Sequence, residues 1–134
     1  MPTLLITRPE ADAAPLIRRL DALGIDSVAA PLLDIEYLEG PELDVETVQA
    51  MLLTSANGAR ALAKRTERRD IPCLAVGDAT AQAATELGFL SVSSAGGDVD
   101  DLAKLAARKC NPKGGVLLHA AGSVSAGDLA AMLE

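Results

Sequence analysis

One pattern recurs four times along this chain: a short apolar run ends at a small polar turn, and an Ala-rich segment with helical spacing follows at once. The copies read LLITRPEA from Leu4, MLLTSANGA from Met51, CLAVGDATA from Cys73 and VLLHAAGSVSAGDL from Val116. Strands that alternate with helices build a parallel sheet, and such folds bind ligands at the turns after the carboxyl ends of the strands. We therefore expect an α/β fold whose functional residues lie in these turns.

The first copy predicts a β-α-β unit. Residues 4–7 read as a strand, residues 9–23 as a helix that opens with Pro9 at its first position, and residues 27–30 as a second strand. Gly24 is placed to end the helix in a left-handed conformation, and Gly88 should end a later helix in the same way.

The regular pattern resumes at residues 52–54, which we expect to form the next strand. The paired acids Asp98 and Asp101 are typical of a helix start. The helices predicted after this point span residues 56–65, 79–87 and 98–107.

The segment PLLDIEYLEG, residues 31–40, breaks the pattern. It alternates apolar and acidic residues from Leu33 to Tyr37, which indicates an extended strand with one exposed face and suggests a connector between domains. We therefore divide the chain into residues 1–31, a linker at 32–40 and a second domain at 41–134.

The last residues look like the start of a further helix. Ser125 and Asp128 resemble a capping box and predict a helix from about Ala126, yet the sequence stops at Glu134 after barely two turns. We expect the chain to be a piece of a longer protein.

Charge and composition argue against several partners. The chain has 19 acidic and 12 basic residues, a net charge of −7, and Tyr37 and Phe89 are its only aromatic residues, so neither phosphate neutralisation nor base stacking is favoured. No apolar run is long enough to span a bilayer. Cys73 and Cys110 show no metal-ligand spacing, and we expect free thiols in a reducing cytoplasm.

Familiar nucleotide and hydrolase motifs are absent: there is no G-x-G-x-x-G, P-loop or nucleophile elbow. What remains is a set of hydroxyl and backbone donors at expected helix starts, which could cradle an anion or could be ordinary helix caps. These donors are Thr7, Arg8, Thr54, Ser55, Asn57, Gly77, Thr80, Gly122 and Ser123.

The single histidine, His119, falls at the carboxyl end of an expected strand, where it could be an acid–base group or simply a polar strand end. The basic cluster on and after the helix at 56–65 fits a solvated helix face, the alternative being the steering of a polyanion. Its members are Arg60, Lys64, Arg65, Arg68 and Arg69.

Together these segments resemble the uroporphyrinogen-III synthase family. The resemblance rests on LITRP with its following helix, GIDSVAAPLLDI, LLTSANGARAL, LAVGDATAQAATELGF and GGVLLHAAGSVSAGDLAAML, in this order along essentially the whole chain. It implies two flavodoxin- or Rossmann-like three-layer α/β domains joined by a two-stranded ladder, with the active site in the cleft between them. The first domain would be discontinuous and incomplete in this chain, and about half of the enzyme would lie beyond Glu134.

The resemblance also implies a reaction: hydroxymethylbilane, a linear tetrapyrrole, is cyclised to uroporphyrinogen III with inversion of ring D and loss of water, without a cofactor or metal. The tyrosine often proposed to assist loss of the hydroxyl would lie beyond Glu134, and Ala126 stands where many relatives carry Arg. The implied substrate contacts are Thr7, Arg8, Ser55, Asn57, Thr80 and Gly122.

One alternative from another class stays open: a non-catalytic flavodoxin-like or receiver-like α/β binding domain. Against it, the strand at 52–54 ends in Thr54 and Ser55, where a receiver needs an acceptor aspartate, and TRPEAD is not a flavin phosphate loop. We expect the full-length synthase to be a monomer. This piece alone should be inactive, and it should self-associate through its first β-α-β unit, for instance as a swapped dimer.

Overall fold

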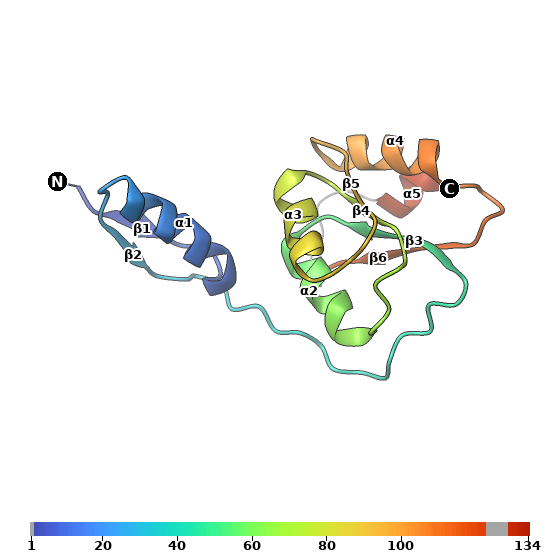
Figure 1. Ribbon diagram of the computed structural model, residues 1–134, viewed down its shortest axis with the longest axis horizontal. Helices are drawn as coiled ribbons and strands as arrows, with labels where there is room; N and C mark the ends of the chain where they lie inside the picture. Colours follow the sequence, from blue (N-terminus) through green and yellow to red (C-terminus); the bar gives the residue numbers. More distant parts are fainter. Residues whose placement is uncertain (1, 123–128) are drawn as a thin grey trace. The chain divides into compact units, whose positions relative to one another are not determined.

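The computed structural model describes residues 2–122 and 129–134, and the chain divides into two compact units, Met1–Tyr37 and Leu38–Glu134 (Figure 1). The boundary between the units falls within the segment 32–40 that the sequence marks as a linker. We call them unit 1 and unit 2. Among the described residues, no helix is long and apolar enough to cross a membrane.

Unit 1 is a single β-α-β element. Strand β1 (Leu4–Ile6) leads into α1 (Glu10–Ala22), and β2 (Ser27–Ala29) pairs with β1 in parallel. The expected β-α-β unit is confirmed, but the prediction that Pro9 is the first helical residue is wrong. Its ψ of 146° is extended, so Pro9 precedes the helix, which begins at Glu10. Gly24 follows the helix with φ 71°, a left-handed conformation that a glycine adopts without strain.

The two-stranded sheet of unit 1 has one covered face. Ile6 is buried, and so is Ala13 on the helix that packs over the sheet. Leu5 and Val28 are paired in register and remain 64% and 52% exposed. Side chains alternate along a strand, so these two lie on the face that α1 does not cover.

Unit 2 contains a four-stranded parallel sheet in the order β5-β4-β3-β6, with four helices among its described residues (Figure 1). Its strands are β3 (Val48–Leu53), β4 (Cys73–Ala75), β5 (Val92–Ser94) and β6 (Val116–Ala120). Its helices are α2 (Ala56–Arg65), α3 (Asp78–Glu86), α4 (Val99–Lys109) and α5 (Leu129–Leu133).

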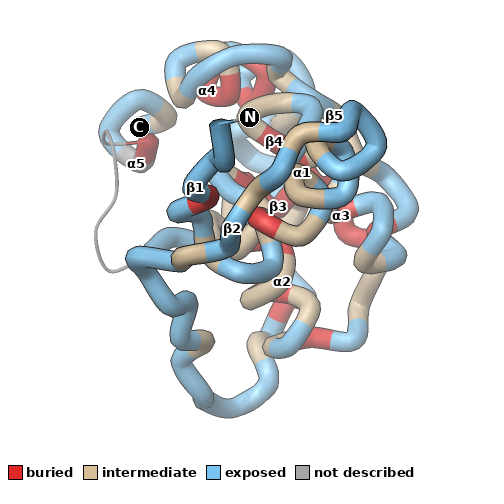
Figure 2. The backbone as a smooth tube through the Cα atoms, turned by 90° about the vertical axis from the view of Figure 1, so that its left-hand side faces the viewer, coloured by how far each residue is buried: buried red, intermediate tan, exposed pale blue. Residues whose placement is uncertain are grey.

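Both faces of this sheet are buried, as a parallel sheet requires. Met51 and Leu53 of β3 pack with Leu62 of α2, while the alternate residue Leu52 packs with Leu102 of α4 and with α5. Figure 2 shows the buried residues along β3 and β4, whereas unit 1 is mostly exposed or intermediate. Unit 2 is therefore a three-layer α/β/α domain, and the expected parallel α/β fold is confirmed.

The strand order reverses direction once. From β3 the chain moves outward through β4 to β5, with α2 and α3 on one face, and α4 then crosses the other face to place β6 on the free side of β3. The two strands that flank this topological switch point are β3 and β6. In open α/β sheets the crevice outside the carboxyl ends of such strands is the usual ligand site.

Element bounds agree closely with the sequence for most of the chain. The helix at 56–65 is confirmed at both ends, Gly88 adopts φ 95°, and Asp98 and Asp101 form a reciprocal capping box. The extended strand predicted at 32–40 is wrong: this segment forms no strand, because no described residue supplies the partner that a ladder needs. The capping box predicted at Ser125 and Asp128 lies outside the described residues.

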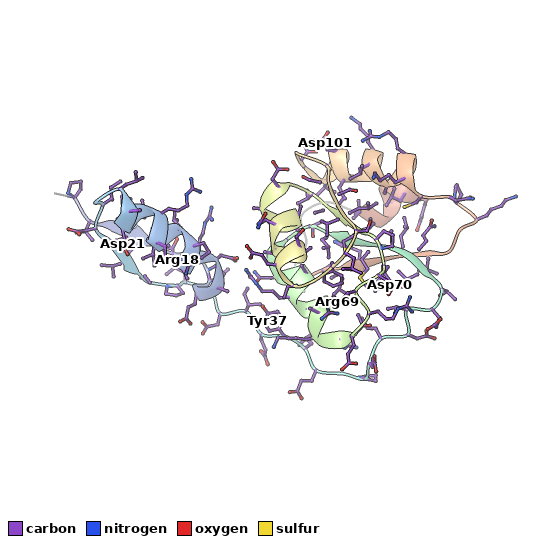
Figure 3. All side chains as sticks on the ribbon, in the orientation of Figure 1. Arg18, Asp21, Tyr37, Arg69, Asp70 and Asp101 are labelled. Carbon is purple, nitrogen blue, oxygen red and sulfur yellow. The ribbon has the colours of Figure 1, made fainter. Side chains whose placement is uncertain are left out.

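The solvated-face interpretation of the basic cluster fails at Arg69. Its guanidinium, labelled in Figure 3, donates to the carbonyls of Ala63, Thr66, Arg68 and Leu87 at 2.7–3.2 Å. It also lies 4.9 Å from the centre of the Phe89 ring. Arg69 therefore ties the end of α2 to the end of α3, just before the start of β4.

Candidate functional site

The turn from β3 into α2 carries the sequence TSANG. Ser55 is extended and precedes the helix, and its Oγ accepts a hydrogen bond of 3.1 Å from the Gly58 N–H. Asn57 Oδ1 accepts from Arg60 Nη1 at 2.8 Å, which holds a guanidinium over the first turn of α2. The turn therefore combines a capped helix start with a fixed positive charge, and both favour an anion.

Gly58 brings this turn against the end of β6. A Cβ on Gly58 would lie 2.9 Å from the Ala120 carbonyl oxygen, closer than real Cβ contacts allow. Any larger residue would push α2 away from β6. Gly58 thus sets the close approach of the two segments that flank the switch point.

Thr54 and His119 join β3 to β6 at the same edge. Thr54 Oγ1 lies 3.1 Å from His119 Nε2, a half-buried side-chain hydrogen bond between the residue that follows one strand and the penultimate residue of the other. Burial lowers the pKa of His119 below its usual 6.5, so the imidazole is neutral near pH 7. A neutral imidazole has one donor and one acceptor nitrogen.

The predicted contacts Ser55, Asn57 and Gly122 gather around this switch point. Ser55 and Asn57 follow β3, and Gly122 is exposed and follows β6. Because β3 and β6 are neighbouring parallel strands, these turns emerge side by side at the carboxyl edge of the sheet. Ser123, another expected donor, lies outside the described residues.

Thr80 lies one strand away and is differently placed. It is on α3, after β4, and only 7% exposed. The residues at this end of the sheet are acidic. Asp78 accepts a hydrogen bond from Ser94 Oγ at 2.7 Å, and the side chains of Asp98 and Asp101 each accept from the other's backbone N–H at the start of α4, where Figure 3 labels Asp101. Among the described residues, this edge of the sheet is therefore electrostatically uneven, with Arg60 at the β3–β6 end and the carboxylates at the β4–β5 end.

Thr7 and Arg8 lie in unit 1, directly after β1, and both are exposed. Within unit 1 the Thr7 carbonyl accepts a 3.2 Å hydrogen bond from the Leu32 N–H. Their position at the carboxyl end of a parallel strand matches that of Ser55 and Asn57 in unit 2.

Sequence reasoning missed two features of the site. The role of Gly58 could have been suspected from a glycine inside the first turn of a helix, where it costs stability unless close packing demands it. The pairing of Thr54 with His119 had no local signal, because it depends on which strands are neighbours. Among the described residues, no group of three His, Cys, Asp or Glu side chains could hold a metal ion.

Comparison with known proteins supports one family. The model of the family described as uroporphyrinogen-III synthase HemD matches residues 14–134. A search of curated proteins found no match to this chain. The match spans most of unit 1 and all of unit 2, and enzymes of this family act in tetrapyrrole biosynthesis. The chain therefore belongs to the uroporphyrinogen-III synthase family.

Proposed function

We propose that the protein carrying this chain is a hydro-lyase that cyclises hydroxymethylbilane to uroporphyrinogen III with inversion of ring D and loss of water. The observation that carries the proposal is the family match over residues 14–134. No described feature favours a receiver-like or flavin-binding alternative, since β3 is followed by Thr54 and Ser55 and not by an aspartate.

The chemistry asks for positioning more than for activation. The C–O bond of the hydroxymethyl group breaks, the oxygen leaves as water, and the pyrrole nitrogen stabilises the resulting electrophile. The substituted α-carbon of ring D then attacks this electrophile and forms a spiro intermediate. The bond from that carbon to the bridge from ring C breaks, and the bridge carbon forms a new bond to the free α-carbon of ring D. The proton displaced there balances the proton that the departing hydroxyl takes up. No electron is transferred and no group carrier is consumed, which is why we propose a reaction without a cofactor.

The substrate carries many carboxylates, and the corner between β3 and β6 suits them. Ser55, Asn57 and Arg60 supply a hydroxyl, an amide and a guanidinium at the start of α2, and Gly122 supplies a backbone N–H in the segment after β6. Contacts that hold the carboxylates also hold the two ends of the linear tetrapyrrole in the geometry that spiro attack requires. The acidic β4–β5 end would repel the same groups, so we propose that the substrate lies toward β6. Thr7 and Arg8 of unit 1 and Thr80 remain proposed contacts.

We propose that these 134 residues alone are inactive, because the active site implied for the family lies in a cleft between two complete domains. The two free cysteines fit a cytoplasmic location, where thiols stay reduced.

The test is an assay of the complete protein with hydroxymethylbilane, in which the isomers of the product are separated. The proposal expects the III isomer well above the rate of spontaneous closure, which gives the I isomer. Formation of the I isomer alone would overturn it.

A matched pair of variants probes the site within this assay. Asn57→Asp places a carboxylate beside Arg60 and should raise KM about tenfold, which corresponds to about 1.4 kcal/mol of lost binding. Asn111→Asp adds the same charge at the other edge of the sheet, where the side chain accepts from the Lys113 N–H, and should leave KM unchanged. Equal effects of the two variants would contradict the placement of the substrate.

A further inference from the structure

The hydrogen bond between Thr54 and His119 crosses the switch point of unit 2. Thr54 follows β3 and His119 is the penultimate residue of β6, and these two strands flank the point where the strand order reverses. A cross-strand polar pair at this position lies where ligands of open α/β sheets bind. Neither residue is among the substrate contacts that the family resemblance implies.

The pair is backed by apolar side chains. His119 follows Leu117 by two residues and therefore lies on the same sheet face, and Leu117 packs with Leu52 and Leu102. A hydrogen bond over such an apolar layer is screened less by water than one at an open surface.

The direction of this hydrogen bond decides whether the Thr54 hydroxyl can donate a further hydrogen bond to a ligand. With the proton on Nε2, the imidazole donates to Thr54 Oγ1, and the threonine hydroxyl hydrogen is left to point elsewhere. With the proton on Nδ1, Thr54 donates to the imidazole and can only accept. Carboxylates only accept hydrogen bonds, so the first tautomer alone makes Thr54 a ligand for them.

We propose that His119 is a positioning residue of the substrate site: its Nε2–H donates to Thr54 Oγ1 and turns the Thr54 hydroxyl toward a carboxylate of the substrate. This rests on the function proposed above. It adds Thr54 as a substrate contact, and it gives His119 a role that acts through Thr54 and not on the reacting atoms.

The test is a double-mutant cycle in the complete protein, read as KM and kcat with hydroxymethylbilane. Thr54→Val and His119→Leu should each raise KM about tenfold and leave kcat within about twofold, because each removes the same oriented donor. The double variant should then be no worse than either single variant. His119→Gln, which keeps an N–H donor at a similar reach, should restore KM to within about threefold of the wild type.

Other outcomes separate the two proposals. If the wild type forms the III isomer but His119→Leu leaves KM unchanged, the inference fails while the proposed function stands. The same holds if the two substitutions are additive, at about a hundredfold in KM, since the residues would then act independently. A wild type that forms only the I isomer would overturn the function itself.

Two further measurements guard against a purely structural effect. Ser93→Ala removes another side-chain hydrogen bond of unit 2, the 3.0 Å bond from Lys109 Nζ, and should leave KM unchanged. Nitrogen NMR of the imidazole in this chain reads the tautomer without any substrate. A proton on Nε2 supports the inference, and a neutral ring with its proton on Nδ1 would overturn it.

Discussion

Units 1 and 2 are built from the same strand–turn–helix pattern, but they differ in how many sheet faces they cover. Unit 2 buries β3 from both sides, through α2 and α3 on one face and α4 and α5 on the other. Unit 1 has one helix over two strands, and among its described residues the buried apolar ones are Ile6 and Ala13. The pattern alone specifies a β-α-β element, and a three-layer core needs a crossover on the second face.

The difference extends to function. A sheet of two strands has no reversal of strand order, and the segment beside the turn at Thr7 and Arg8 in unit 1 is the apolar stretch after β2. Unit 2 has a reversal between β3 and β6, and two turns with polar donors emerge there together. The same type of turn therefore contributes to a site with polar residues from two adjacent strands in unit 2, whereas in unit 1 the polar residues come from one strand.

The largest expected effect compares matched leucines in the two sheets. Leu53→Ala empties a fully buried position of β3 and should cost about 2–5 kcal/mol of unfolding free energy, because the surrounding side chains fill the cavity only in part. Leu5→Ala in β1 removes a side chain that is 64% exposed and should cost about 0.5 kcal/mol or less. Denaturant unfolding of both variants measures the contrast, and equal costs would mean that the uncovered face of unit 1 is buried in solution.

A smaller expected effect concerns self-association through the sheet face of unit 1 that α1 leaves uncovered. We propose that two copies of this chain associate through the Leu5 and Val28 face of unit 1, because an uncovered apolar sheet face with free strand edges favours pairing. Leu5→Lys with Val28→Lys should weaken association at least tenfold in sedimentation equilibrium. A wild-type chain that stays monomeric across micromolar concentrations would contradict this proposal.

Much of this architecture could be predicted from local signals. The helix at 56–65 has a serine cap, a clear apolar face and a basic last turn, so its bounds match the structure. The start of β3 could not be predicted, because Gln49 looks polar for a buried strand. Its side chain is satisfied at long range, donating to the carbonyls of Asn111 and Gly115 at 2.9 Å and 2.7 Å.

The candidate site was only partly predictable for the same reason. Ser55 and Asn57 stand next to a recognisable helix start, but the partner of His119 depends on β6 lying beside β3, a contact across 65 residues of sequence. Thr80 looks equivalent to Ser55 in the sequence, yet the structure buries it. The order of the strands in the sheet decides which of these similar turns become neighbours, and no local sequence pattern predicts that order.

Tetrapyrrole binding at the carboxyl edge of unit 2, between β3 and β6, is the proposal on which the site residues depend. It can be tested by an NMR titration of the ¹⁵N-labelled chain with uroporphyrinogen III, followed at each backbone amide. We predict saturable shifts concentrated at residues 54–60 and 119–122, with none at the opposite edge around Asn111 and Gly115. Shifts centred on that opposite edge, or no saturable shift at residues 54–60, would contradict this placement.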